Sequence, residues 1–206
     1  RGLGDVYKRQ EYNNAGFDTI ILGVTSGKYD IAISSFTIND ERMQQVNMVQ
    51  YFNAGTSWAV KKGNPKAVDP NNACGLNVAV QKGTVQVDDL EAKSKACVDA
   101  GKKAINAIVE GEQSKATADV VSGKADATLA DSPIAAYAVK QTAELELVGE
   151  MYDAAPYGIV LPKADTEMST LVSEALVKLK ANGVYDAILA KWGNTSGGVT
   201  AFPVNP

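Results

Sequence analysis

Two side chains of opposite charge stand where predicted strands end, and together they could bind the two ends of a zwitterion. Arg42 follows Ile33–Thr37 and is the only arginine after residue 10, although the chain has 20 Lys and Arg residues. A guanidinium binds a carboxylate through two parallel hydrogen bonds, which lysine cannot reproduce. Asp131 follows Ala125–Ala130 and precedes Ser132-Pro133, a typical helix start. A cation and an anion so placed predict recognition of a free amino acid.

Hydroxyl and backbone groups accompany these two charges. Ser35 and Thr37 stand where the segment before Arg42 changes from apolar to polar. In Gly83-Thr84-Val85, a glycine follows a strand and a helix begins, so free backbone N–H groups there could hold an anion. Ligands of open α/β sheets bind at the carboxyl ends of strands. These two strand ends are therefore candidate ligand-binding positions.

Each of these residues also has a purely structural explanation. Arg42 could form an exposed salt bridge with Glu41 or Asp40. Thr84 and Asp131 could simply be the N-caps of the helices that follow them. Spacing alone leaves these alternatives open.

Composition excludes several functions. The chain has no His, which removes the commonest general base and metal ligand, so we expect neither a catalytic Ser-His or Cys-His pair nor a metal or cofactor. A net charge of −4 with scattered lysines argues against nucleic-acid binding. No apolar run approaches the roughly 20 residues of a membrane helix. Cys74 and Cys97 are too far apart for a C-x-x-C site, which leaves a disulfide or two buried thiols.

Apolar periodicity predicts an alternation of strands and helices, hence an α/β fold with a largely parallel sheet. The predicted strands are Tyr29–Ser34, Leu76–Val80, Ala104–Val109, Ala125–Ala130 and Leu145–Val148. The predicted helices are Val85–Lys95, Gln113–Val121, one beginning near Pro133, and two near the C-terminus. In the last two, Met168, Leu171, Val172, Ala175, Leu176, Leu179, Val184, Ile188, Leu189 and Trp192 recur at helical spacing. We expect these apolar stripes to be core.

Several motifs in order resemble the family 3 extracellular solute-binding proteins, the polar amino-acid receptors of ABC importers. They are Ser26-Gly27-Lys28-Tyr29-Asp30, Ser35-x-Thr37 with Arg42, Val80–Thr84, Gly123–Ala127, Ala130–Pro133, Tyr157-Gly158-Ile159, and Asn182-Gly183-x-Tyr185 with Lys191-Trp192-Gly193. The resemblance covers residues 17–193. The segment Cys74–Cys97 and the phrase Tyr152–Gly158 resemble the actinobacterial branch, whose members are lipid-anchored outside the cell.

This resemblance implies a two-lobed periplasmic-binding-protein-like fold (type II) joined by two crossing strands, near Phe52–Thr56 and Asp153–Tyr157. Residues 11–54 and 156–206 would form lobe 1, without its N-terminal part, and residues 55–155 lobe 2. Residues 1–10 connect poorly to the rest and are expected to be a non-native leader.

The resemblance also implies roles for the site residues. Arg42 would hold the α-carboxylate with the Thr84 and Val85 N–H groups, Ser35 and Thr37 would contact both α-groups, and Asp131 would pair with the ammonium. Closure of the lobes on the ligand would mark the state that a permease recognises.

The implied protein is a monomeric binding component that delivers a polar or charged amino acid to an ABC transporter permease, without catalysis. It would lie outside the cytoplasm, as a cell-surface lipoprotein or in the periplasm, after export by a signal peptide. Its only membrane contact would be a lipid anchor in the missing N-terminus. That location favours a Cys74–Cys97 disulfide. The alternatives are an enzyme on the same fold, similar to the dehydratases of cyclic acids, and an amino-acid sensor module.

Overall fold

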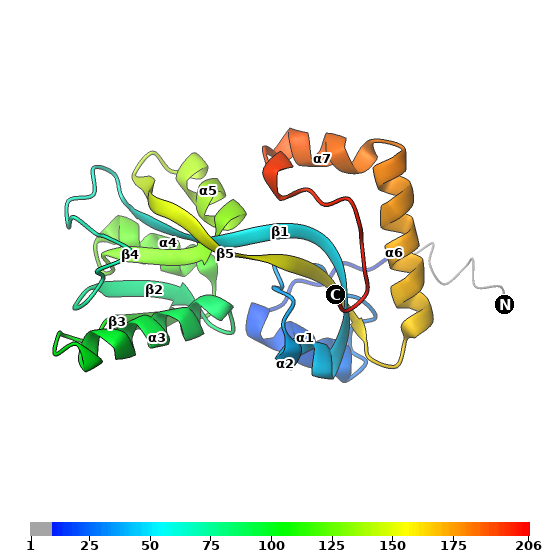
Figure 1. The fold of residues 1–206 in the computed structure, drawn as a ribbon, viewed down its shortest axis with the longest axis horizontal. Helices are drawn as coiled ribbons and strands as arrows, with labels where there is room; N and C mark the ends of the chain where they lie inside the picture. The colour runs from blue at the N-terminus through cyan, green and yellow to red at the C-terminus, as the bar shows by residue number, and fades with distance from the viewer. Residues whose placement is uncertain (1–9) are drawn as a thin grey trace.

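Residues 10–206 are described by a computed structural model, which consists of two lobes connected by two long strands (Figure 1). Strand β1 covers Val46–Lys61 and β5 covers Leu145–Pro162. The two strands pair antiparallel, and both extend from one lobe into the other (Figure 1). The predicted crossing segments contain the pairs Phe52–Tyr157 and Ala54–Ala155, which confirms this part of the prediction. The expected leader lies almost wholly outside the described residues.

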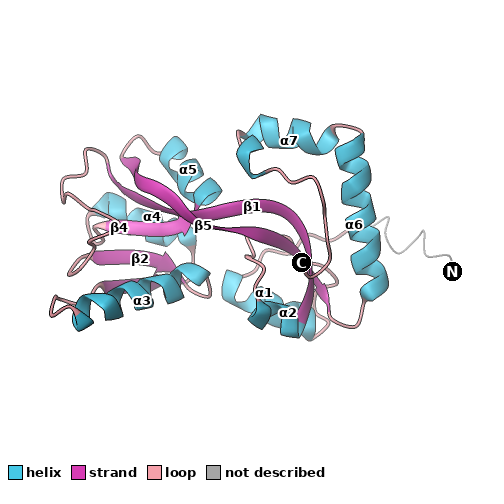
Figure 2. Ribbon diagram, in the orientation of Figure 1, coloured by secondary structure: helices cyan, strands magenta, loops and turns pink. Residues whose placement is uncertain are grey.

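Lobe 2 holds the remaining strands and three helices. They are β2 (Asn77–Gln81), α3 (Val85–Asp99), β3 (Asn106–Glu110), α4 (Gln113–Ser122), β4 (Ala127–Asp131) and α5 (Ser132–Gln141). The strand order is β3-β2-β4-β1-β5, with helices packed against the sheet (Figure 2). Strand β2 is parallel to β3 and β4, whereas β1 is antiparallel to β4 and β5. The prediction of a largely parallel sheet is wrong for β1 and β5. Strand β1 lies between β4 and β5 and pairs antiparallel with both.

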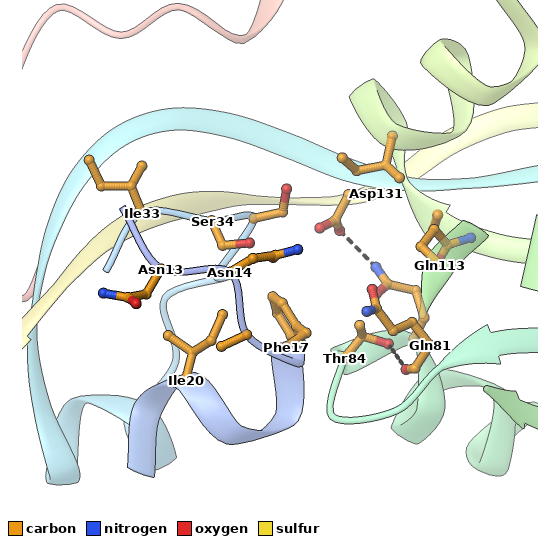
Figure 3. A pocket seen from close by; sticks show the side chains of 15 residues that line it. Asn13, Asn14, Phe17, Ile20, Ile33, Ser34, Gln81, Thr84, Gln113 and Asp131 are labelled. Carbon is orange, nitrogen blue, oxygen red and sulfur yellow. Dashed lines mark hydrogen bonds between the residues drawn. The ribbon is translucent and has the colours of Figure 1, made fainter. Parts of the chain in front are cut away.

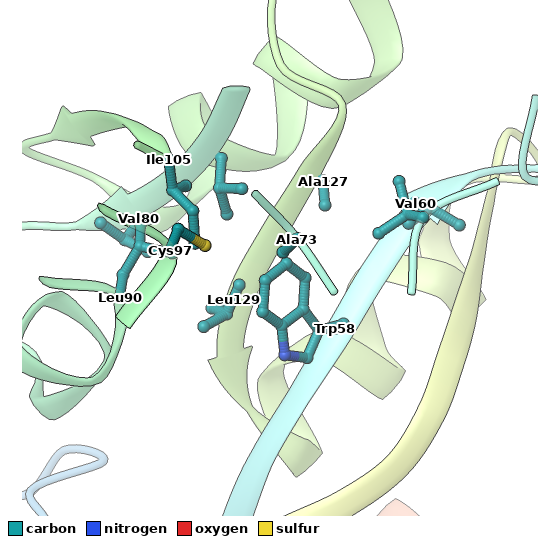
Figure 4. Packing of buried hydrophobic residues seen from close by; sticks show 11 residues of the cluster. Trp58, Val60, Ala73, Val80, Leu90, Cys97, Ile105, Ala127 and Leu129 are labelled. Atoms are coloured by element: carbon teal, nitrogen blue, oxygen red, sulfur yellow. The ribbon is translucent and has the colours of Figure 1, made fainter. Parts of the chain in front are cut away.

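Apolar side chains between α3 and the sheet form the core of lobe 2. Trp58 is fully buried and packs with Leu90 and Leu129 (Figure 4). Cys97 belongs to the same cluster and forms a disulfide with Cys74. The expected Cys74–Cys97 disulfide is therefore confirmed, and the alternative of two buried thiols is wrong.

Lobe 1 contains the other ends of β1 and β5 together with four helices and a short 3-10 turn. They are α1 (Phe17–Thr25), α2 (Asp40–Gln45), α6 (Thr166–Ala181), α7 (Val184–Trp192) and the 3-10 turn Thr195–Gly197. Buried residues of α1, the following loop, β1 and β5 form one core: Val24, Phe36, Ile38, Val46, Met48 and Val160. None of the helices within residues 10–206 is long and apolar enough to cross a membrane.

Two predictions in lobe 1 are wrong. The segment Tyr29–Ser34 is not a strand, because its only β-pairing is a single bridge between Ala32 and Val160.

The apolar residues of the two C-terminal helices belong to the core on one face of each helix only. Met168, Val172 and Leu176 pack against β1 and β5. Side chains on the outer sides of α6 and α7 remain between 37% and 61% exposed: Leu171, Leu179, Val184, Ile188 and Trp192. Among the described residues, no element covers that side of the two helices.

Candidate functional site

A cavity of about 290 Å³ lies between the lobes and receives side chains from both. Phe17, Ser34 and Asn14 project into it from lobe 1, and Asp131 and Gln113 from lobe 2 (Figure 3). Its lining is Asn13, Asn14, Ala15, Phe17, Ile20, Ile33, Ser34, Ser35, Gln81, Thr84, Gln86, Gln113, Ala130, Asp131 and Ile134. A second cavity of about 200 Å³ shares Asp131 and is lined by Thr37, Ala54, Thr56, Val85, Asp89, Asp153 and Ala155.

Arg42 lies in the first turn of α2, which begins after Asn39. The Asn39 side chain accepts a hydrogen bond from the Arg42 backbone N–H and so caps the helix. The guanidinium is buried, and the residue is only 8% exposed. Its Nη1 donates to the Thr37 carbonyl at 2.7 Å, and its Nη2 donates to the Gly83 carbonyl at 3.0 Å. The second bond connects lobe 1 to lobe 2.

The charge of Arg42 is not matched by a neighbouring carboxylate. Within residues 10–206, no Asp or Glu oxygen lies within 4.0 Å of its guanidinium nitrogens. The alternative of an exposed salt bridge with Glu41 or Asp40 is therefore wrong. Burial lowers the pKa of Arg42, while the more distant charges of Asp131, Glu41 and Asp88 act against that shift. A buried cation without a counter-ion is costly unless an anion binds beside it.

Asp131 is the matching anion of lobe 2. It occupies the N-cap position of α5, but its carboxylate does not cap the helix. Instead, Oδ1 accepts a hydrogen bond from Nε2 of Gln86 at 2.8 Å, and the same amide group donates to Thr56 Oγ1 at 3.0 Å. Burial raises the pKa of Asp131, and the nearby Tyr157 hydroxyl, the Gln86 amide and the charge of Arg42 oppose the rise. No Lys or Arg nitrogen of the described residues lies within 4.0 Å of this carboxylate.

The structure brings the other predicted residues to the same cleft. Ser35 and Thr84 line the first cavity, and Thr37 and Val85 line the second. Thr84 is the residue before α3, but its hydroxyl donates to the Gln81 carbonyl at 2.8 Å and does not cap the helix. The first-turn N–H groups of a helix have no intrahelical acceptor, so those of α3 can receive an anion here.

Sequence reasoning missed several lining residues. Gln81 ends β2, Gln86 lies in the first turn of α3, and Gln113 begins α4. The rule that ligands bind at the carboxyl ends of strands could have identified Gln81. Phe17 was missed because nothing in the sequence showed that α1 would face lobe 2. These residues add amide donors and acceptors and one aromatic face to the site.

The fold and the cleft define a two-lobed binding protein of the type II periplasmic class, and comparisons with known proteins agree. The model of the bacterial extracellular solute-binding proteins, family 3, matches residues 4–195, and the chain belongs to this family. Members of the family are extracytoplasmic.

Two curated relatives bind amino acids. The arginine-binding protein ArgT of Corynebacterium glutamicum is 36% identical over 183 residues, which are 88% of this chain and 60% of ArgT. The ABC transporter glutamine-binding protein GlnH of Bacillus subtilis is 28% identical over 192 residues, or 92% of this chain and 67% of GlnH. The chain thus spans about two thirds or less of the length of these relatives.

Solved structures confirm the predicted fold class. An ancestral arginine-binding protein bound to arginine is 34% identical, with a TM-score of 0.79 over 88% of this chain and 79% of that one. The ancestral amino acid-binding protein AncCDT-1, a precursor of cyclohexadienyl dehydratase, is 31% identical, with a TM-score of 0.73 over 88% and 77% of the two chains.

Proposed function

We propose that the protein captures a free amino acid, polar or charged, between its lobes and delivers it to an ABC importer. The observation that carries this proposal is the pair of buried, unmatched charges, Arg42 of lobe 1 and Asp131 of lobe 2. An α-carboxylate beside Arg42 and an α-ammonium beside Asp131 would neutralise both charges at once. Because the two charges belong to different lobes, the ligand would stabilise the closed arrangement of the lobes.

The remaining site residues have proposed roles in the same scheme. The backbone N–H groups of Thr84 and Val85 would complete the carboxylate site at the start of α3. The hydroxyl groups of Ser35 and Thr37 would contact the two α-groups from lobe 1. We propose the lobe boundaries at residues 54/55 and 155/156, within the crossing segments of β1 and β5.

The named relatives suggest which amino acids to test first. ArgT and one ancestral structure bind arginine, and GlnH and a second ancestral structure bind glutamine. Gln81, Gln86 and Gln113 line the cavity with side-chain amides, which can donate to or accept from either ligand. L-arginine and L-glutamine are therefore the first probes. We further propose that the protein acts as a monomer and is exported by a signal peptide, as a surface lipoprotein or a periplasmic protein.

An enzyme on the same fold is the second candidate, because AncCDT-1 is the precursor of a dehydratase and Asp131 has a raised pKa inside the cleft. We propose that Asp131 binds and does not catalyse, because the named curated relatives are binding proteins. A cyclohexadienyl carboxylic acid incubated with the protein should show no loss of water.

A thermal-shift screen of the twenty amino acids tests the proposed function. A ligand at about 100 times its Kd should stabilise the folded protein by about 2.7 kcal/mol, which raises Tm by roughly 5–11 °C for a chain of this size. Arg42→Ala should abolish the shift, and Arg42→Lys should lose most of it because lysine lacks the bidentate fork. A folded protein that responds to no amino acid, or an Arg42→Ala variant that responds as the wild type does, would contradict the proposal.

A further inference from the structure

Tyr157 carries a buried hydroxyl group that forms no hydrogen bond of good geometry with the described residues. The residue is only 3% exposed, and its hydroxyl satisfies the distance and angle of a hydrogen bond with no other residue in the part of the chain that the structure describes. A buried polar group without a partner is rare and costs free energy, so it calls for an explanation. None of the sequence motifs assigned a role to this side chain.

The backbone and the ring fix where this hydroxyl lies. Tyr157 pairs with Phe52 of β1 on one side and forms a bridge with Thr37 on the other. Its ring packs against the rings of Tyr51 and Phe52, with centroid distances of 6.2 and 5.8 Å. The phenol is therefore held at the point where β5 crosses between the lobes, beside a residue that lines the second cavity.

Two residues of the first cavity face the hydroxyl. They are Asp131 from lobe 2 and Ser35 from lobe 1. Burial and the negative charge of Asp131 raise the pKa of Tyr157, so the phenol keeps its proton at neutral pH. It can donate that proton to the carboxylate while its oxygen accepts another hydrogen bond.

We infer that Tyr157 is a further ligand-binding residue, whose hydroxyl donates to Asp131 and accepts one N–H of the ligand's α-ammonium. An ammonium group has three N–H donors, and a fully desolvated one needs three acceptors. Asp131 supplies one, the hydroxyls of lobe 1 supply another, and the Tyr157 oxygen supplies the third. The ligand would thus supply the hydrogen bond of good geometry that no described protein group makes with this hydroxyl. The inference rests on the proposed function, because it requires an amino acid in the cleft.

Tyr157→Phe separates this role from a structural one. Phenylalanine keeps the ring contacts with Tyr51 and Phe52 and removes only the hydroxyl. Because no described protein group forms a hydrogen bond of good geometry with the hydroxyl, we expect the variant, measured without ligand, to be as stable as the wild type or slightly more stable. Its affinity for L-arginine or L-glutamine, whichever binds, should fall on the order of 10- to 100-fold, as expected for the loss of a hydrogen bond to a charged group.

Tyr185→Phe is the matched control. The Tyr185 hydroxyl donates to the Tyr51 carbonyl at 2.8 Å and accepts from the Val199 N–H at 2.9 Å, and neither of these partners lines either cavity. This variant should lose stability and keep its affinity per folded molecule. The two variants should therefore show opposite patterns in chemical denaturation and in calorimetric titration.

The des-amino acids, 5-guanidinopentanoic acid or 4-carbamoylbutanoic acid, test the contact with the ammonium. They should bind wild type and Tyr157→Phe equally. A Tyr157→Phe variant with unchanged affinity, or one that is clearly destabilised without ligand, would overturn the inference, as would an equal loss of affinity for the des-amino acid. A wild-type protein that binds no amino acid would instead refute the proposed function, and this inference with it.

Discussion

Nζ of Lys82 lies 2.8 Å from Oδ2 of Asp18, and this ion pair joins the turn before α3 in lobe 2 to helix α1 in lobe 1. The hydrogen bond with Lys82 lowers the pKa of Asp18 below its ordinary value. Beside it, the Arg42 guanidinium donates to the Gly83 carbonyl across the same gap. Two polar contacts therefore join lobe 1 to lobe 2.

Removing the ion pair should weaken ligand binding slightly. We expect Asp18→Asn to lower the affinity for the amino acid by a few-fold at low salt, because the closed state loses one exposed attraction. The difference from the wild type should disappear at roughly 0.5 M salt, where such charges are screened. Calorimetric titration at two salt concentrations measures both effects.

The control for this variant is Asp99→Asn, which removes an exposed ion pair with Lys95 inside α3, far from the lobe contact. It should leave the affinity unchanged at both salt concentrations. Equal affinities of wild type and Asp18→Asn at low salt would show that the Asp18–Lys82 pair does not contribute to closure.

Close approach of the lobes also requires a glycine at position 83. Gly83 has φ = +78°, and a Cβ atom there would lie 2.9 Å from Cβ of Asp18. Gly83→Ala should therefore lose stability through its backbone conformation, by about 1–2 kcal/mol. It should also lower ligand affinity, because the new methyl group keeps the lobes apart.

Gly101→Ala isolates the backbone effect. Gly101 has φ = +70°, and nothing lies within 4 Å of the position of its Cβ. This variant should show a similar loss of stability with unchanged affinity. If Gly83→Ala bound the ligand as tightly as Gly101→Ala, the lobes would not need to approach as closely as they do here.

The disulfide should stabilise lobe 2 without affecting the site. Cys74 and Cys97 are separated by 23 residues and line neither cavity. Replacing both with Ser should cost about 3 kcal/mol in the chain-entropy model, or roughly 6–12 °C in Tm. The affinity of the protein that remains folded should be unchanged. A large loss of affinity at a temperature where the variant is fully folded would contradict this separation of stability from binding.

The charged part of the site is predictable from residue type and position alone. Arg42 is conspicuous because arginine is rare in this chain, and Asp131 because it follows a strand. Their burial and the absence of a counter-ion beside each cannot be read from the sequence, because both depend on contacts between distant segments. The Gly83 carbonyl lies 41 residues from Arg42, and the Gln86 amide lies 45 residues from Asp131. The role proposed for Tyr157 could not be read from the sequence for the same reason.

Elements without a clean periodicity were the ones that sequence analysis missed. Strand β1 is buried on both faces over most of its length, so its apolar residues do not alternate, and Gln50 and Asn53 interrupt them. Helix α1 begins after Gly16 with no side-chain cap and is rich in β-branched residues, which favour strands. Conversely, the spacing of Ile188 and Trp192 correctly predicted a helix, but both side chains are exposed. Periodicity identifies an apolar face of a helix and does not show that another element packs against that face.

The pH dependence of binding should follow Asp131. Burial raises its pKa above the ordinary value of 3.8, and the groups that face it and oppose the rise are Tyr157, Gln86 and Arg42. In the empty protein the folded state therefore holds this proton more tightly than the unfolded state does. Its contribution to the free energy of unfolding should decrease as pH rises from about 3.8 through the raised pKa. Ligand affinity should change in the opposite direction, because the ammonium binds the ionised carboxylate.

Calorimetric titrations and denaturation curves between pH 4 and pH 8 measure how ligand affinity and the free energy of unfolding change with pH. The Asp131→Asn variant separates the contribution of Asp131 from that of the other acidic groups. The asparagine variant should bind weakly at every pH and lack this contribution to both slopes, since its amide does not titrate. An affinity that changes equally with pH in wild type and Asp131→Asn would mean that another group receives the ammonium. In that case the partner of the ammonium would have to be sought among Asp89 and Asp153, the other carboxylates that line the second cavity.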